Sequence, residues 1–340
     1  MIPTRLRVAA INFLNPAPLM WDFNHPPLSS QLAERYQIHS IQPAQCAIEL
    51  LEGRADLGLI PIAALTPELT IVPGCTIASL DRVRSIQLIV KLNRNSSQNI
   101  IPLNKDCHSD TERSAGEESP HFVRSATESD QILASVRSIA ADTASRSSLA
   151  YTQILFNRFL ATDPAFIPAP ANPIAMLHQA DAALLIGDPA LLALESRAEI
   201  EASVGPCLWL DLAHEWIART GLPWVAAVWA VRSEALTSTS PAQLLADLEQ
   251  SRDHGLANID QLVSEWTPRI AIPSNIISNY LNHNIHYRLT PSCIEAIQLF
   301  RRYAAEAAIL PPLPNLRFLQ SSKQISPHRD FPSPTSVIPS

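Results

Sequence analysis

The chain has 340 residues, of which 46% are hydrophobic and 17% charged, and its formal net charge is −7. This composition is typical of a globular protein, and the length suffices for a substantial core and for two lobes. The negative charge and the lack of a basic run argue against a nucleic-acid or anionic-membrane partner, whereas a local cationic site can still bind a small anion.

Three further features of the composition narrow the class of protein. The N-terminal stretch contains no apolar signal-peptide core, and no apolar run approaches the ~18 residues of a membrane span, so we expect a cytoplasmic protein without a membrane partner. The eight glycines form no GxGxxG or P-loop pattern, which disfavours a glycine-rich nucleotide site. The five cysteines never have CxxC spacing, so neither a disulfide framework nor a structural zinc site is expected.

The N-terminal quarter predicts strands that alternate with helices. Strands are expected over residues 6–14, 55–62 and 84–90. A helix is expected over residues 43–54, with a proline in its first turn and a glycine near its end. This alternation predicts an α/β protein built from βαβ units around a largely parallel sheet.

Residues 93–135 interrupt the alternation, because they are polar and charged and show no sustained periodicity. We expect a surface insertion that is largely disordered. Residues 318–340 are rich in Ser and Pro and are expected to form a disordered tail.

Between these two polar segments the pattern returns and then becomes helical. The expected strands are 138–142, 182–186 and 222–231, the last leading out of the second region. Helices are expected over 149–160, near Met176, and over 274–281 and 291–310, and one or two helices are expected over 241–266.

The turn before the helix at 149–160 reads A-D-T-A-S-R-S-S and crowds four hydroxyls around Arg146. Ser and Thr commonly precede helices because they satisfy unpaired N–H groups, which is the simpler interpretation of any one of them. Four hydroxyls and a guanidinium exceed what a cap requires, and a helix N-terminus favours an anion. We therefore predict a site for a carboxylate or phosphate, although Arg146 can equally pair with a structural acid.

Three other polar residues stand near the ends of predicted strands. Asn15 follows the first strand, where open α/β sheets bind ligands, yet an ordinary turn before a proline explains it better. Ser85 begins a strand without a G-x-S-x-G elbow or a triad pattern, and is most simply a half-buried strand serine. Asp188 precedes a proline and an apolar run, which is the pattern of a helix N-cap.

No metal site or cofactor is predicted. His283 and His286 have the i, i+3 spacing that can hold a metal ion, but no acidic or cysteine partner accompanies them at ligand spacing. We expect both histidines on the surface near the end of a helix.

Six stretches together resemble the chorismate dehydratases of the futalosine route to menaquinone. They occur in order over about residues 5–317, apart from the insertion. The stretches are I-N-F-L-N-P (11–16), G-R-A-D-L-G-L-I-P (53–61), V-R-S-I-Q-L (83–88), D-T-A-S-R-S-S (142–148), D-A-A-L-L-I-G-D (181–188) and T-G-L-P-W-V-A-A-V-W-A (220–230). Asn12 is a departure, because the family more often has a Ser-Tyr pair there.

The resemblance implies a fold like that of the type II periplasmic binding proteins, with two α/β lobes, a cleft between them and two crossover strands as a hinge. Lobe one would combine residues 1–88 and 233–317, and lobe two would hold residues 89–232. The implied reaction is that of a hydro-lyase, the loss of water from chorismate to give 3-[(1-carboxyvinyl)oxy]benzoate.

The resemblance also assigns residues to the site. Asn15 and Ser85 would fall on the family's active-site Asn and Ser, and the S-R-S-S turn would bind one of the two carboxylates of chorismate. The substrate-binding residues would be Ser145, Arg146, Ser147, Ser148 and Gly187.

Three other functions are compatible with a protein of this architecture. A non-catalytic solute-binding protein normally carries an export signal, which the sequence does not show. The sibling enzyme 1,4-dihydroxy-6-naphthoate synthase shares the fold, but the N-F-L-N-P and S-R-S-S stretches fit the dehydratase better. A regulatory ligand sensor would need a DNA-binding element, and none accompanies the lobes.

Overall fold

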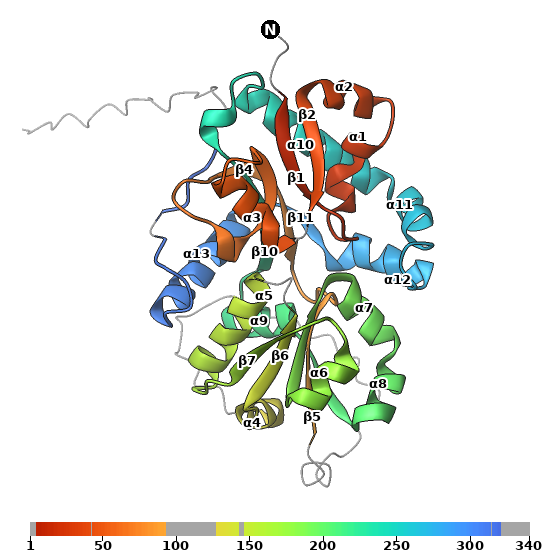
Figure 1. Ribbon diagram of the computed structural model, residues 1–340, viewed down its shortest axis with the longest axis vertical. Helices are drawn as coiled ribbons and strands as arrows, with labels where there is room; N and C mark the ends of the chain where they lie inside the picture. Colours follow the sequence, from red (N-terminus) through yellow and green to blue (C-terminus); the bar gives the residue numbers. More distant parts are fainter. Residues whose placement is uncertain (1–4, 42, 93–126, 143–145, 314, 321–340) are drawn as a thin grey trace, which may run out of the picture.

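A computed structural model describes residues 5–41, 43–92, 127–142, 146–313 and 315–320 of the chain. These residues form two α/β lobes, each organised around one sheet (Figure 1). The two-lobed α/β architecture expected from the sequence is therefore confirmed.

Lobe one contains a six-stranded sheet in the order β11–β4–β10–β3–β1–β2. Its strands are β1 (Leu6–Ile11), β2 (Tyr36–Ile41), β3 (Leu57–Pro61), β4 (Thr70–Ser79), β10 (Trp224–Val231) and β11 (His286–Arg288). Strand β1 runs parallel to β2 and β3, whereas β10 is antiparallel to β3 and β4, and β11 is antiparallel to β4.

Lobe two contains a five-stranded sheet in the order β7–β6–β8–β5–β9. Its strands are β5 (Ile86–Lys91), β6 (Ser138–Asp142), β7 (Ala165–Ala169), β8 (Ala182–Ile186) and β9 (Cys207–Asp211). Strand β6 is parallel to β7 and β8, and β5 is antiparallel to β8 and β9.

Both sheets are mixed, so the prediction of a largely parallel sheet was wrong. The reason lies in β5 and β10, which each follow a passage of the chain from one lobe to the other. Each of these strands starts at the boundary between the lobes and runs outward, against its neighbours β8 and β3. The alternation of apolar runs and helices in the sequence carries no information about this reversal.

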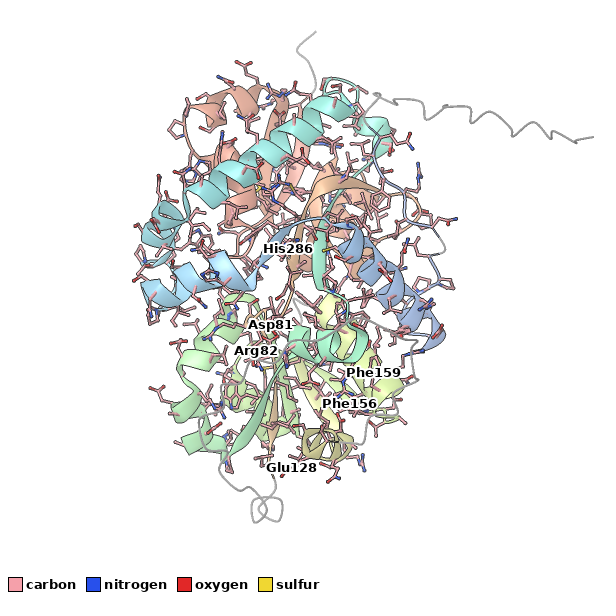
Figure 2. The ribbon with its side chains drawn as sticks, turned by 180° about the vertical axis from the view of Figure 1, so that it is seen from behind. Asp81, Arg82, Glu128, Phe156, Phe159 and His286 are labelled. Carbon is pink, nitrogen blue, oxygen red and sulfur yellow. The ribbon has the colours of Figure 1, made fainter. Side chains whose placement is uncertain are left out.

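The chain passes between the lobes around residues 80–85 and 221–223. Figure 2 labels Asp81 and Arg82 in the first passage and Glu128 at the far end of lobe two. The sequence assigned residues 222–231 to lobe two, and this part of the division is corrected, because β10 pairs with β3 and β4 in the sheet of lobe one.

Helices cover the sheets of both lobes (Figure 1). Those of lobe one are α1 (Trp21–Asn24), α2 (Leu28–Arg35), α3 (Pro43–Leu51), α10 (Pro241–Ala257), α11 (Ile259–Trp266), α12 (Ser274–Asn279) and α13 (Pro291–Glu306). Those of lobe two are α4 (Glu128–Ala134), α5 (Ser147–Ile154), α6 (Pro173–Gln179), α7 (Gly187–Glu195), α8 (Arg197–Val204) and α9 (Leu212–Thr220).

Short 3₁₀-helical and π-helical turns lie between these elements. The 3₁₀ turns are η1 (Ala17–Met20), η2 (Ile62–Ala64) and η5 (Ser233–Ala235), and the π-helical turns are η4 (Leu155–Phe159) and η6 (Tyr280–Asn284). The helix expected over 149–160 therefore begins at Ser147 and widens after Ile154. Of the one or two helices expected over 241–266, the structure has two, α10 and α11.

Two of the expected disordered segments are partly ordered. Residues 128–134 form α4, whose start is fixed by a reciprocal capping box between Thr127 and Asp130. Phe318 forms an isolated bridge with Ile71 in β4, so residues 318–320 are ordered as well. Residues 93–126 and 321–340, which carry the rest of these two predictions, lie outside the described residues.

Buried apolar side chains form one cluster that includes residues from both lobes and a smaller cluster within lobe two. All five residues of β3 and of β8 are buried, as expected for central strands covered on both faces. Within the described part of the chain, no helix has both the length and the apolar character that a membrane crossing requires.

Candidate active site

A pocket lies between the lobes, with about 630 Å³ of empty space, part of it open to solvent. Its lining residues include those at the ends of β1, β3 and β8 and those at the starts of β5 and β10. Strands of both sheets therefore have one end at the pocket. Among the described residues, the predicted site residues that line the pocket are Asn15, Ser85, Arg146, Ser147, Ser148 and Gly187. Ser145, and Thr143 of the same turn, lie outside the described residues.

The remaining lining of the pocket is apolar and comes from both lobes, with Phe13, Pro61, Val83 and Trp224 among its residues. A mostly apolar cavity with a few convergent polar groups is the usual form of a small-molecule site. Arg146 carries the single charge among the described lining residues, and no described acid pairs with it. A ligand that neutralises this pocket must therefore bring its own negative charge.

The start of α5 lies at this pocket. The first hydrogen bond within α5 runs from the N–H of Ala150 to the carbonyl of Arg146, at 3.1 Å. The N–H groups of Ser147, Ser148 and Leu149 therefore have no partner within the helix. N–H groups without a partner in their own helix, together with the positive end of the helix dipole, favour an anion here. Arg146 occupies the N-cap position, and its side chain makes no capping hydrogen bond.

The hydroxyl of Ser147 has protein partners of its own. It donates to the carbonyl of Ala226 at 3.0 Å and accepts the N–H of Ala63 at 3.3 Å. Ala63 belongs to η2, which follows β3, and Ala226 belongs to β10. This side chain therefore holds the tip of α5 against lobe one, and the group that Ser147 can offer a ligand is its backbone N–H.

A bulge in β10 provides the second attachment of α5. The register between β10 and β4 shifts between Val225 and Ala227, so that Ala226 has no partner residue in β4. The hydroxyl of Tyr151 donates to the carbonyl of Val225 at 3.0 Å and accepts its N–H at 3.3 Å. Tyr151 is buried, so burial raises the pKa of its hydroxyl and keeps it a donor.

Ser148 differs from its neighbour, because its hydroxyl has no hydrogen-bond partner among the described residues although the residue is only 4% exposed. A buried hydroxyl without a protein partner is costly unless a ligand or water completes it. Among the described residues of the turn, Ser148 and Arg146 are thus the two whose side chains are available to a bound anion.

Asn15 lies in the turn that leads from β1 to η1, closed by the N–H of Ala17 donating to the carbonyl of Leu14 at 3.1 Å. The turn interpretation of this residue is therefore correct, and the position at the pocket is correct as well. The side-chain amide forms no hydrogen bond with another described residue. It can both donate to and accept from a ligand.

Ser85 stands at the first passage between the lobes, held on both sides. Its carbonyl accepts the N–H of Gly187 at 2.7 Å, and its hydroxyl accepts a hydrogen bond from Tyr280 at 2.8 Å. The preceding residue, Arg84, has a left-handed backbone with φ of 61°. This conformation is stabilised by the carboxylate of Asp211, which accepts the N–H of Arg84 at 2.6 Å and that of Val83 at 3.2 Å.

Asp211 performs two tasks with one carboxylate. Besides the two N–H groups before Ser85, it accepts those of Ala213 and His214 at 3.1 and 3.2 Å as the N-cap of α9. Burial raises the pKa of this carboxyl, and the four N–H groups oppose that rise. The sequence signal for this residue was the ordinary capping pattern D-L-A-H, which does not reveal that the same side chain positions Ser85.

Gly187 begins α7 with a left-handed φ of 61°. A Cβ atom built on it would lie 3.1 Å from two ring carbons of Phe13, a residue of lobe one. Glycine is therefore required both by the backbone conformation and by the close approach of the opposite lobe. The N–H of Gly187 reaches Ser85 for a separate reason, because Ile186 and Ile86 are paired in the ladder between β8 and β5.

Asp188 is not the N-cap that the sequence predicted. Helix α7 begins at Gly187, and no side chain caps it. The carboxylate of Asp188 instead accepts the N–H of Leu14, across the boundary between the lobes, at 3.3 Å. Burial raises the pKa of this carboxyl to about 6. Its structural role is confirmed, but the partner is in the other lobe.

The described residues contain no group of three or more His, Cys, Asp or Glu side chains placed to hold a metal ion. His283 is exposed in η6, as expected, whereas His286 is half-buried in β11. Burial lowers the pKa of His286.

The comparison with protein families identifies the chain. The family model described as menaquinone biosynthesis matches residues 6–109 and 117–306. The chain is also similar to a chorismate dehydratase of Thermus thermophilus, with 30% identity over 149 residues. That match covers 42% of this chain and 52% of the relative, so it spans about half the length of the relative.

Solved structures share the fold at low sequence identity. A protein from Archaeoglobus fulgidus has a TM-score of 0.61 and 13% identity, over 90% of this chain and 98% of that chain. The periplasmic aliphatic sulphonate-binding protein SsuA of Escherichia coli has a TM-score of 0.59 and 14% identity, over 98% and 97%. The alkanesulfonate-binding protein SsuA of Xanthomonas axonopodis, bound to MOPS, has a TM-score of 0.56 and 18% identity, over 92% and 96%.

These likenesses confirm the expected two-lobed, type II periplasmic-binding-protein-like fold. The family match covers most of the chain, including every described residue that lines the pocket. The protein therefore belongs to the menaquinone biosynthesis family.

Proposed function

We propose that the protein is a chorismate dehydratase, a cytoplasmic hydro-lyase that removes water from chorismate to give 3-[(1-carboxyvinyl)oxy]benzoate in the futalosine route to menaquinone. The observation that carries the proposal is the polarity of the pocket. Its described lining is apolar except for three serines, one asparagine and one arginine, and the arginine stands at an open helix N-terminus.

This arrangement suits a small ring with two carboxylates. One carboxylate binds at the tip of α5, where Arg146 supplies the charge and the first N–H groups and Ser148 supply hydrogen bonds. The ring lies against the apolar walls, and Asn15 and Ser85 line the same pocket. Burial of the ring and the charge-assisted hydrogen bonds both contribute to affinity.

The reaction is an elimination. A base takes the proton from the ring carbon that bears the ether oxygen, and the electron pair left behind forms a ring double bond. The bond from the neighbouring carbon to its hydroxyl breaks, and that hydroxyl leaves with the bonding electrons and combines with a proton to give water. The ring becomes aromatic, which drives the step.

The described pocket contains no acidic side chain and no histidine that could act as this base. We therefore assign the proton to the enolpyruvyl carboxylate of the substrate itself. The protein then contributes orientation, hydrogen bonds to the departing hydroxyl and exclusion of water. Asn15 and Ser85 suit these roles because neither side chain titrates near neutral pH.

Purified protein incubated with chorismate tests the proposal, with the aromatic product followed by its ultraviolet absorbance and identified by mass. We expect turnover by the wild type and a large loss for Asn15→Ala, Ser85→Ala and Arg146→Ala. Wild-type turnover with near-normal rates in all three variants would show that the reaction takes place elsewhere. Binding of chorismate without product would favour a solute-binding protein.

A further inference from the structure

The hydroxyl of Tyr280 contacts the site residue Ser85, although Tyr280 itself does not line the pocket. Tyr280 opens η6 in the C-terminal part of lobe one, is 1% exposed, and donates a hydrogen bond of 2.8 Å to the hydroxyl of Ser85. The two residues are 195 positions apart in the sequence. Tyr280 is absent from the pocket lining, so it acts on a bound molecule only through Ser85.

The direction of this hydrogen bond determines what Ser85 can do. A serine hydroxyl has one proton to donate and two lone pairs that accept. Because Tyr280 donates to one lone pair, the proton of Ser85 remains available, and no described residue accepts it. Ser85 is 3% exposed and lines the pocket, so the pocket is where this proton finds an acceptor.

Tyr280 is a permanent donor. Burial raises the pKa of its hydroxyl far above the ordinary value, and the negative charges of Asp188 and Asp211 raise it further. The tyrosine therefore stays protonated at neutral pH. A donor of this kind polarises the hydroxyl that accepts from it and strengthens the hydrogen bond that hydroxyl donates onward.

The backbone of Ser85 is fixed independently, which leaves the hydroxyl as the part that Tyr280 controls. Asp211 holds the two preceding N–H groups, and Gly187 donates to the carbonyl of Ser85. Removing the hydroxyl of Tyr280 would leave these contacts in place while releasing the Ser85 hydroxyl to rotate.

We propose that Tyr280 is a positioning residue that orients the hydroxyl of Ser85 as a hydrogen-bond donor to the hydroxyl that departs from the substrate. The proposal rests on the proposed function, because it requires a leaving group at Ser85. No proton is transferred from either side chain: the Ser85 hydroxyl donates a hydrogen bond, and the leaving hydroxyl carries away its own bonding electrons.

The test is a double-mutant cycle of Tyr280→Phe and Ser85→Ala, with kcat and KM for chorismate measured in all four proteins. We expect Tyr280→Phe alone to lower kcat by roughly threefold to tenfold with little change in KM, as for the loss of one net hydrogen bond. In the Ser85→Ala background the same substitution should leave kcat unchanged, because the group that Tyr280 orients is gone.

Tyr287→Phe is the matched control. Tyr287 is 3% exposed and lies near Tyr280, but its hydroxyl has no hydrogen-bond partner within the described part of the chain. This variant should keep the wild-type kcat. Two results would overturn the proposal by showing that the effect arises from packing. One is that Tyr280→Phe lowers kcat equally in the wild-type and Ser85→Ala backgrounds. The other is that Tyr287→Phe lowers kcat as much as Tyr280→Phe does.

The proposed function fails in a different way. If the wild type neither turns over nor binds chorismate, as measured by calorimetry, the function itself is wrong and the role of Tyr280 falls with it. If the wild type and the Ser85→Ala variant have the same kcat, Ser85 has no catalytic role and Tyr280 none through it. If Ser85→Ala is impaired and Tyr280→Phe is not, the proposed function stands and only the positioning role is refuted.

Discussion

Arg146 carries the single charge in the described lining of the pocket, and no described residue offsets it. We expect Arg146→Ala to raise KM for chorismate by roughly tenfold to a hundredfold, since hydrogen bonds to charged groups are worth about 1.5–3 kcal/mol. The KM of Arg146→Lys should lie between those of the wild type and Arg146→Ala, because lysine keeps the positive charge but cannot form a bidentate pair with a carboxylate. Steady-state kinetics measures both effects.

Arg197 provides the control for this substitution. It is the first residue of α8, its side chain is exposed, and it pairs with Glu201 in the same helix. Arg197→Ala removes a positive charge near a helix start remote from the pocket, and should leave KM unchanged. If the two alanine substitutions raised KM equally, the change in net charge would explain the effect, and a local anion site at Arg146 would be contradicted.

Asp188 gives the protein a pH-dependent stability. Its pKa is raised from the usual 3.8 to about 6, so the folded protein binds this proton more tightly than the unfolded chain does. Such an acid favours folding at low pH, and that contribution is lost as the pH rises toward and through 6. Above pH 6 the ionised carboxylate costs roughly 3 kcal/mol.

Asp188→Asn removes this cost and retains an oxygen that can accept the N–H of Leu14. The free energy of unfolding of the variant should exceed that of the wild type by roughly 3 kcal/mol at pH 8 and by about half of that at pH 5. Urea denaturation at both pH values measures the difference. A gain that is the same at both pH values would contradict the assigned titration.

At the scale of elements, α5 is held against lobe one by side chains that bond to the bulge of β10 and to η2. Ser147→Ala removes the partner of the Ala226 carbonyl and of the Ala63 N–H. We expect a loss of about 1–3 kcal/mol in the free energy of unfolding, since both backbone groups then lack a protein partner. Thermal and urea denaturation measure it.

The neighbouring Ser148→Ala is the counterpart of this substitution. Its hydroxyl has no described partner, so the unfolding free energy should change little, whereas the affinity for chorismate should fall by severalfold. The two variants thus separate the residue that holds the helix from the residue that faces the ligand. The opposite pattern would reverse these two assignments.

The sequence predicted those elements whose signal is local. The apolar run of β8 and the starts of α3, α10 and α13 at a proline were identified correctly. For these elements the signals of burial and capping come from residues that are adjacent in the sequence. Strand β4 was missed because Pro73 and Gly74 interrupt it and indicate a turn. In the structure the strand continues through them, and the register with β10 shifts there.

The candidate site was also predicted only in part. The family resemblance predicts that Asn15, Ser85 and Arg146 share one pocket, and these three residues do meet there. The hydrogen-bond partners of the site residues were beyond prediction, because each contact joins segments that are distant in the sequence. The hydroxyl of Ser147 is bonded to β10, and Tyr280 reaches Ser85 from the C-terminal part of the chain.

At the scale of the molecule, the site exists only while the two lobes lie against each other. Gly187 of lobe two approaches Phe13 of lobe one so closely that a methyl group would require a shift. Gly187→Ala should therefore lower kcat/KM by at least about tenfold, since small displacements of positioned groups are costly to catalysis. The same change should destabilise the protein by about 1–2 kcal/mol, because φ is left-handed.

Gly221 separates these two effects. It also has a left-handed φ, of 70°, as the C-cap of α9, and a Cβ atom there would meet nothing within 4 Å. Gly221→Ala should cost similar stability and retain wild-type kinetics. Comparable kinetic losses in both variants would attribute the effect at Gly187 to strain alone and not to the contact between the lobes.

The most direct measurement is a crystal structure of the protein with 3-[(1-carboxyvinyl)oxy]benzoate, which is stable and retains both carboxylates of the substrate. The ligand is predicted to lie between the lobes, with one carboxylate within hydrogen-bond distance of Arg146 and of the first N–H groups of α5, and with its ring beside Asn15 and Ser85. A ligand bound outside this pocket, or in it with no carboxylate at the start of α5, would contradict the account.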